Sequence, residues 1–403
     1  RDFLSVARKV LARIASNNQV DKSDLISFIN KIKSESSFRY NSKLYNETEF
    51  SARKVKEVLP TYAPDAEEVD GRIVLRDNFD KMFSDIPEAM IFGEDVGKIG
   101  GVNQGVEGLQ AKYGELRVSD TGIRETTILG QGIGLSLRGL KPIAEMQYLD
   151  YLLYAFQTMA DDIATLHYRT HGGQISPVII RTRGHRLEGI WHSGSPMGMI
   201  IHGTRGVNIC VPRDMTKAAG FYNTLMVSNE PAMVVECLNS YRVKEKLPNN
   251  MGEFRTPLGI PETTKEGKDV TIVTYGSTWR IVTEAANQLE EFGISAEVID
   301  IQTLVPLDIN HTMIESLKKT NRLLVVDEDV PGGASAYILQ NIIEDQKGFY
   351  HLDSEPQTLA AKAHRCAYGK DGDYFSKPSI EDVFEKVYNM MHEVDPQRFP
   401  ELY

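Results

Sequence analysis

The sequence predicts an α/β protein of two units, each a mostly parallel sheet flanked by helices, preceded by a helical amino-terminal extension. From residue 71 onward, short apolar runs rich in Val and Ile alternate with amphipathic stretches, which is typical of buried parallel sheets. Residues 240–268 interrupt the alternation with Pro, Asn, Gly and mixed charges, which indicates a domain boundary. We therefore expect an extension and linker over 1–70, a first α/β domain over 71–245 and a second over 268–403.

Each element is predicted from its own pattern. In the extension, DFLSVARKVLARIASNN and KSDLISFINKIKSE carry apolar residues at helical spacing, and a polar linker follows them. In the first domain, apolar runs bounded by turn residues predict strands at 89–96, 141–146, 176–182, 207–212 and 232–238. Helical spacing predicts helices at 124–139, 151–169 and 216–228.

The second domain repeats this alternation. The sequence predicts strands at 269–277, 295–302 and 322–329 and helices at 279–293, 310–320 and 334–346. Gly293 ends the first of these helices and suits a left-handed C-cap.

Composition excludes several classes of function. A formal net charge of −11 argues against a nucleic-acid partner, which needs clustered Lys and Arg. The sequence has no apolar run long enough for a bilayer span and no secretory signal. Its three cysteines have neither disulfide-framework nor zinc spacing. We expect a protein of the cytoplasm, or of the mitochondrial matrix if eukaryotic. Because the chain starts at Arg1 rather than Met, we expect a fragment, a processed product or a trimmed chain.

The glycine and acidic motifs do not predict a phosphate or metal site in this chain. Neither GxGxxG after a strand nor a P-loop occurs in the required context. We expect Gly130, Gly132 and Gly134 to allow close packing of a helix on the sheet or on a partner. The DGD at 371–373 lies in a turn-like stretch and is interpreted as a solvated loop, so no metal ligand is assigned.

Two segments carry candidate functional side chains. Asp120 or Thr121 is expected to cap a helix whose first turn includes Glu125, and a carboxylate there is ordinarily a favourable surface charge. Tyr148, Tyr151 and Tyr154 are spaced by three, as in a core or interface stripe.

The loop GHRLEGIWHSGSP, residues 184–196, is too rich in Gly, Ser and Pro for a helix or strand, yet carries a Trp and two His. On these residues alone, His192 is either a working side chain or a polar residue in a turn.

These pieces together resemble one family. IFGEDVGKIGGVNQGVEGLQAKYG, SDTGIRE, KPIAEMQYLDYLLYAF, WHSGSP and VNICVPRD follow one another as in the β subunit of thiamine-diphosphate-dependent 2-oxo acid dehydrogenases, relatives of transketolase. VTIVTYGS, SAEVIDIQTLVPLD and LLVVDEDVPGGASAYI resemble the carboxy-terminal transketolase domain of that subunit. The resemblance covers residues 71–403 and implies a pyrimidine-binding domain followed by that carboxy-terminal domain.

The resemblance implies a role for each candidate. Glu125 matches the carboxyl that hydrogen-bonds the aminopyrimidine ring and favours its imino form, which can deprotonate the thiazolium C2. That carboxyl must stay protonated, which burial promotes. Tyr151 matches an aromatic over the pyrimidine, Ile123 an apolar contact and Gln147 a side chain lining the pocket, while Tyr148 and Tyr154 keep their core interpretation.

His192 matches the family's active-site histidine. It is expected to deliver a proton when the acyl group passes to a lipoyl disulfide on the acyltransferase core, which suits a side chain that titrates near neutral pH. His185 is interpreted as a flanking residue.

The sequence also departs from the family. ETT at 125–127 replaces the usual EQG, which puts the local packing at the pyrimidine in doubt. The diphosphate and Mg²⁺ motif, GDG followed by Asn, is missing. In the family it lies in the α subunit, so the resemblance implies an α subunit or a fused α half as partner, in an α2β2 heterotetramer or a dimer of fused chains. The long amino end and missing Met suggest that this is the carboxy-terminal half of a fused chain.

The expected function is oxidative decarboxylation of a 2-oxo acid with acyl transfer to lipoamide. HSGSP and VPRD favour a branched-chain acid over the pyruvate or acetoin type. A transketolase or deoxyxylulose-phosphate synthase half is a rival, and so is a non-catalytic assembly subunit, against which the joint presence of Glu125, Tyr151 and His192 speaks.

Overall fold

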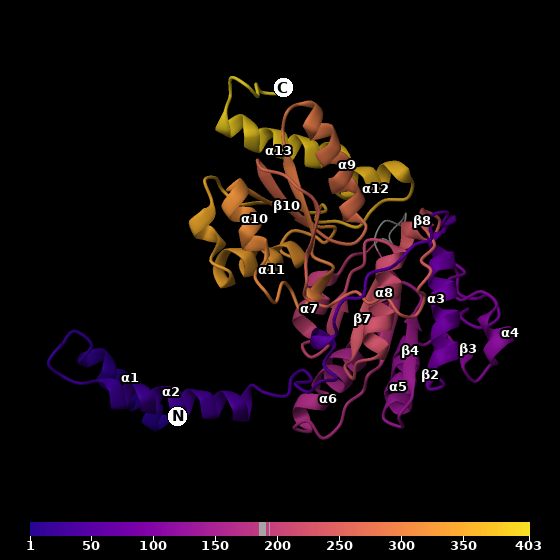
Figure 1. Ribbon diagram of the computed structural model, residues 1–403, viewed down its shortest axis with the longest axis horizontal. Coiled ribbons are helices and arrows are strands. Elements are labelled where there is room, and N and C mark those ends of the chain that lie inside the picture. Colours follow the sequence, from indigo (N-terminus) through magenta and orange to yellow (C-terminus); the bar gives the residue numbers. More distant parts are fainter. Residues whose placement is uncertain (185–190, 193) are drawn as a thin grey trace.

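The computed structural model describes residues 1–184, 191–192 and 194–403. It has the two-unit α/β architecture that the sequence predicts, with helices on the faces of mostly parallel sheets (Figure 1). The strands are β1 (Glu68–Asp70), β2 (Ala89–Gly93), β3 (Val118–Asp120), β4 (Lys141–Met146), β5 (Ile179–Gly184), β6 (Asn208–Cys210), β7 (Ala232–Cys237), β8 (Lys244–Lys246), β9 (Glu262–Lys265), β10 (Val270–Thr274), β11 (Ala296–Asp300), β12 (Thr303–Val305), β13 (Leu323–Val326) and β14 (Gln357–Leu359).

The helices fall into two classes. The α-helices are α1 (Asp2–Arg13), α2 (Ser23–Tyr40), α3 (Gly71–Asp85), α4 (Leu109–Tyr113), α5 (Glu125–Ser136), α6 (Ala164–Arg169), α7 (Met197–Gly203), α8 (Met215–Met226), α9 (Thr278–Glu291), α10 (Met313–Thr320), α11 (Ala334–Gln340), α12 (Lys370–Ser376) and α13 (Ile380–Val394). Shorter 3₁₀ or π turns are η1 (Ala52–Lys54), η2 (Leu149–Tyr154), η3 (Thr158–Ile163), η4 (Leu238–Ser240), η5 (Asn341–Asp345) and η6 (Gly348–His351). None of the helices described is long and apolar enough to cross a bilayer.

The larger sheet has the order β12-β6-β7-β5-β4-β2-β3 and is parallel except for β12. Its central strands are buried along their whole length, as expected for a sheet covered on both faces. The second sheet has the order β14-β13-β10-β11-β9, with β9 antiparallel. Strand β12, contributed by the carboxy-terminal unit, pairs with β6 of the first, a tie between the units that the sequence did not predict.

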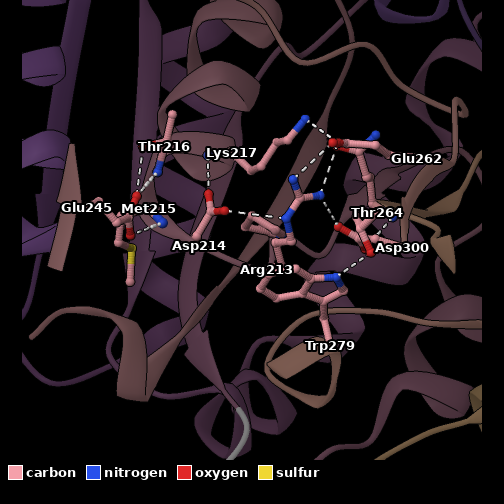
Figure 2. A network of polar contacts seen from close by, with 12 residues as sticks. Arg213, Asp214, Met215, Thr216, Lys217, Glu245, Glu262, Thr264, Trp279 and Asp300 are labelled. Carbon is pink, nitrogen blue, oxygen red and sulfur yellow. Dashed lines mark hydrogen bonds and ion pairs between the residues drawn. The ribbon is translucent and has the colours of Figure 1, made fainter. Parts of the chain in front are cut away.

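A polar cluster reinforces this tie between the units. Arg213, just after β6, donates to Asp300 at 2.7 Å and to Glu262 at 3.0 Å (Figure 2). Its guanidinium lies 5.0 Å from the centroid of the Trp279 ring, within cation–π range. Burial raises the pKa of Asp300 to about 6, although Arg213 opposes the shift.

The amino-terminal extension has two parts. Helices α1 and α2 project away from the body in Figure 1, whereas the segment after them is bound to it. The carboxylate of Glu230 accepts hydrogen bonds from the amides of Asn46 at 2.8 Å and Ala52 at 2.6 Å. The segment therefore follows the surface of the first unit before β1 begins.

Two local predictions are wrong. The prediction of one helix over 151–169 is wrong at its start, where η2 is a 3₁₀ turn, whereas residues 156–169 are helical and include the π-helix η3 and then α6. Residues 371–373 lie in α12 rather than in a loop, where Asp373 pairs with Lys377 at 3.5 Å. Gly293 does follow α9 in a left-handed conformation, with φ 75°.

Candidate active site

The candidate residues lie at one edge of the larger sheet. Ile123 and Glu125 follow β3, Gln147 and Tyr151 follow β4, and His192 follows β5. These strands are parallel and close together in the order β5-β4-β2-β3. Because carboxyl ends of parallel strands meet at the same edge, the topology brings segments distant in sequence to one place.

Glu125 is the first residue of α5, and its side chain and backbone together are only 7% exposed. The helix begins within one residue of the predicted start, but its N-cap is Arg124, so the expected cap by Asp120 or Thr121 is wrong. Asp120 instead accepts hydrogen bonds from the amide of Gly97 at 2.7 Å, which fixes the loop after β2. The outcome is a buried carboxyl at the positive end of a helix.

A second carboxyl, Glu94, was not singled out by the sequence. It follows β2, and burial together with the negative charge of Glu125 raises its pKa. Burial, Tyr148 and Glu94 likewise raise the pKa of Tyr151, to which Asp150 and Glu125 also contribute. The negative charges of Glu94 and Glu125 thus both contribute to the raised pKa of Tyr151. The sequence signal that could have indicated Glu94 is its position directly after the predicted apolar core of β2.

His192 is held by aromatic side chains of the segment after β4. The Tyr151 hydroxyl lies 2.7 Å from His192 Nε2, and the Tyr148 ring centroid lies 4.5 Å from that of the imidazole. Tyr148 is half-buried against the core, but Tyr154 is 66% exposed, so its core assignment is wrong. The main-chain oxygen of Tyr154 accepts from the hydroxyl of Thr126, which joins η2 to the first turn of α5.

The remaining candidates are placed differently. Ile123 is 79% exposed and lines a hollow of about 350 Å³ at the start of α5, together with Thr127 and Gln131. The side-chain amide of Gln147 donates to Asp95 at 2.9 Å. His185 lies outside the described residues.

A buried ionic cluster supports β4 and β5 below this edge. Arg181 donates to Glu145 at 2.5 Å and to Glu236 at 2.8 Å, while Arg183 donates to Glu145 at 2.8 Å and to the Tyr241 hydroxyl at 2.9 Å. Both arginines are fully buried. Burial raises the pKa of Glu236, but Arg181 outweighs it and the net pKa is lowered. These pairs satisfy charges that would otherwise be costly to bury.

Helix α5 has one face on the sheet and one face exposed. A Cβ on Gly132 would lie 2.8 Å from Val178 Cγ2 and 3.4 Å from Ala144 Cβ, so this glycine permits close helix–sheet packing. A Cβ on Gly130 or Gly134 would meet no described atom within 4 Å. The packing prediction is therefore confirmed within this chain for Gly132, and the other two lie on an open face.

The described part of the chain has no group of three or more His, Cys, Asp or Glu side chains that could hold a metal ion. Its cysteines are buried free thiols, and burial raises the pKa of Cys237 well above its ordinary value.

The fold is shared with transketolase relatives of known structure. An inactive β4 tetramer of a split-gene transketolase has a TM-score of 0.62 and 19% identity, covering 80% of this chain and 98% of that one. A transketolase mutant from Pichia stipitis has a TM-score of 0.58 and 15% identity, covering 94% of this chain and 56% of that one.

Sequence comparison gives the family. Residues 67–244 match the transketolase pyrimidine binding domain and residues 261–370 the transketolase C-terminal domain. The pyruvate dehydrogenase E1 component subunit beta of Acholeplasma laidlawii is 33% identical, covering 66% of this chain and 81% of that protein. The 2-oxoisovalerate dehydrogenase subunit beta of Bacillus subtilis is 32% identical, covering 67% of this chain and 82% of that protein. The pyruvate dehydrogenase E1 component subunit beta of the same organism is 36% identical, covering 75% of this chain and 92% of that protein. On this match of both domains in order, the chain belongs to the family of E1 beta subunits of thiamine-diphosphate-dependent 2-oxo acid dehydrogenases.

Proposed function

We propose that the chain catalyses, with an α-type partner, the oxidative decarboxylation of a branched-chain 2-oxo acid and the transfer of the acyl group to lipoamide. The observation that carries this proposal is the hydrogen bond between Tyr151 and His192 beside the buried carboxyl of Glu125, in a chain of the E1 beta family. A fold kept only for assembly would not require these side chains at one edge of the sheet.

The residues present fit one half of a thiamine diphosphate site. Glu125 offers a desolvated carboxyl to hydrogen-bond a ring nitrogen of the aminopyrimidine, Tyr151 an aromatic ring and Ile123 an exposed apolar side chain for the face of that ring. Bound thiamine diphosphate supplies the electron sink for decarboxylation. Glu125 would hold a proton at the ring nitrogen. Gln147, bonded to Asp95, borders this site.

His192 is assigned to proton delivery. When the acyl group passes to a lipoyl disulfide, the S–S bond breaks and the released sulfur takes a proton. The hydrogen bond between the Tyr151 hydroxyl and His192 Nε2 orients the imidazole for that delivery. We expect Tyr151→Phe to slow acylation of a lipoyl domain, because the hydroxyl is lost while the ring remains. An unchanged acylation rate would remove this role for the hydroxyl.

The α-type partner, as a separate subunit or a fused half, is proposed to bind the diphosphate through Mg²⁺. Its oxygen ligands would come from the partner, in an α2β2 heterotetramer or a dimer of fused chains. The open face of α5, with Gly130 and Gly134 free of close neighbours among the described atoms, is a surface on which such a partner can pack. The lipoylated acyltransferase core is the proposed acyl acceptor. We place the complex in the cytoplasm, or in the mitochondrial matrix of a eukaryote.

The relatives include both pyruvate and 2-oxoisovalerate dehydrogenase subunits, so they do not distinguish the two substrates. The proposal of a branched-chain acid is therefore based on the motifs HSGSP and VPRD. The test is to assemble the chain with its α-type partner and measure kcat/KM for 3-methyl-2-oxobutanoate and pyruvate, with a sugar phosphate donor as control. A clear preference for the branched acid is expected. Equal values would overturn the substrate, and activity only on the sugar phosphate would overturn the reaction.

A further inference from the structure

We propose that Asp150 is a positioning residue, which together with Arg365 of the carboxy-terminal unit holds the segment carrying His192 in place for acyl transfer. This inference rests on the proposed function of His192. It concerns a contact between the two units rather than a group that touches substrate or cofactor.

The carboxylate of Asp150 binds both units at once. Its Oδ2 accepts a hydrogen bond from the amide of Gly194 at 2.9 Å, and its Oδ1 accepts one from Arg365 Nη1 at 3.1 Å. Asp150 is 9% exposed, whereas the Arg365 side chain is 57% exposed. Burial therefore strengthens the bond to the Gly194 amide, while solvent weakens the ion pair with Arg365. One carboxylate thus connects η2, the segment after β5 and the stretch after β14.

Gly194 is close to this carboxylate for a steric reason. A Cβ at position 194 would lie 2.3 Å from Asp150 Oδ1 and 2.9 Å from its Cγ. Only glycine allows the main chain to approach near enough for the amide to reach the carboxylate. The glycine and the aspartate therefore form a matched pair.

The 3₁₀ turn η2 contacts the segment that carries His192 through two neighbouring residues. Tyr151 binds the His192 ring, and the neighbouring Asp150 binds Gly194 two residues later. Downstream, Asp329 of the carboxy-terminal unit accepts from the amide of Gly198 at 2.7 Å. Among the described residues, contacts are thus made to His192, Gly194 and Gly198.

A cavity of about 310 Å³ lies at this junction, lined by Asp150, Gly194, Asp329 and Arg365 among others. Beside this cavity the Asp150 carboxylate holds Gly194 through its amide, while Tyr148 and Tyr151 contact the His192 ring. Loss of the bond to Gly194 is expected to displace the imidazole.

The expected effect is on acyl transfer and not on decarboxylation. A displacement of about 1 Å at a reacting group costs up to about 100-fold in rate. We expect Asp150→Ala to slow acylation of a lipoyl domain by a factor approaching that value. Decarboxylation, measured by reduction of an artificial dye acceptor, depends on Glu125 and should change far less.

The experiment uses the chain assembled with its α-type partner. Asp150→Ala, Asp150→Asn and Arg365→Ala are compared in both half-reactions, with thermal unfolding as a check of the fold. Asn can still accept from the Gly194 amide, so Asp150→Asn should recover much of the acylation rate lost in Asp150→Ala. Glu315→Gln, which removes an exposed ion pair with Lys318, is the matched control and should match the wild type.

A second experiment tests the close approach of Gly194 to the Asp150 carboxylate. Gly194→Ala places a methyl group against the Asp150 carboxylate and should slow acylation. In the double variant with Asp150→Ala the clash is gone, so the two effects should be less than additive. Additive effects would overturn the pairing.

The outcomes separate the two proposals. If His192→Gln slows acylation but Asp150→Ala does not, the positioning role is wrong and the function of His192 stands. If Asp150→Ala slows both half-reactions equally, its role is general to the fold and the positioning role is again wrong. If His192→Gln leaves acylation unchanged, the proposed function of His192 fails, and the positioning role that rests on it fails too.

Discussion

The contact between the sheet and α5, the helix that begins with Glu125, can be measured by substituting two of its glycines. Gly132→Ala and Gly130→Ala are the same substitution two residues apart in one helix, so each gains about 1 kcal/mol of helix propensity. Only at position 132 does the new methyl group approach other atoms, lying 2.8 Å from Val178 Cγ2. Overpacking of this kind costs about 2 kcal/mol. Gly132→Ala should therefore destabilise the chain by about 1 kcal/mol and Gly130→Ala stabilise it by about 1 kcal/mol.

The difference between the two variants, about 2 kcal/mol, isolates the steric contact because the propensity gain cancels. The assay is urea unfolding of each variant, followed by circular dichroism with the wild type alongside. Equal unfolding free energies for the two variants would refute the close contact between α5 and the sheet. A less stable Gly130→Ala would refute the open face.

Two further predictions concern the charged clusters. Glu236→Met leaves Arg181 without one of its buried partners. It should lower the free energy of unfolding, measured in urea, by about 3–5 kcal/mol. A decrease below about 1 kcal/mol would contradict a stabilising role for the cluster. Burial raises the pKa of Glu262, but Arg213 and Lys217 outweigh it and lower the pKa to about 2. Its ion pairs therefore stabilise the fold above pH 4.5, and that stabilisation is lost as the pH falls towards 2. Glu262→Gln should be less stable than the wild type at pH 7, and it should lose less stability than the wild type between pH 4.5 and pH 2. If the melting temperatures of variant and wild type depend on pH in the same way, the ion pairs of Glu262 do not contribute to stability.

The strands of the parallel sheets could be predicted because their signal is local. Runs such as 141–146 and 232–238 are apolar throughout and bounded by turns, and they coincide with β4 and β7 to within one residue. The pairing of β12 with β6 could not be predicted. The two strands are about 90 residues apart, and β12 is only three residues long, too short to show a strand pattern of its own.

In the candidate site, too, some features could be predicted from the sequence and others could not. The order of the motifs predicted Glu125, Tyr151 and His192 as candidates, but it does not reveal which of their atoms meet. The hydrogen bond between Tyr151 and His192 depends on how η2 departs from an α-helix. Likewise, Asp120 has the sequence context of a helix cap but bonds the loop after β2, because a carboxylate satisfies whichever free amides the tertiary fold brings near. Tyr154 shares the spacing of its neighbours, but the 3₁₀ turn of η2 directs it to the surface.

The central claim is that this chain contributes the carboxyl of the cofactor half-site through Glu125. Its most direct test is turnover of Glu125→Gln, assembled with the α-type partner and saturated with thiamine diphosphate and Mg²⁺, beside the wild type. The amide keeps the size of the side chain but cannot hold the exchangeable carboxyl proton, so we predict a loss of about 10²–10⁴-fold in turnover with unchanged thermal unfolding. Turnover equal to the wild type would contradict the claim and favour a subunit that keeps the fold for assembly alone.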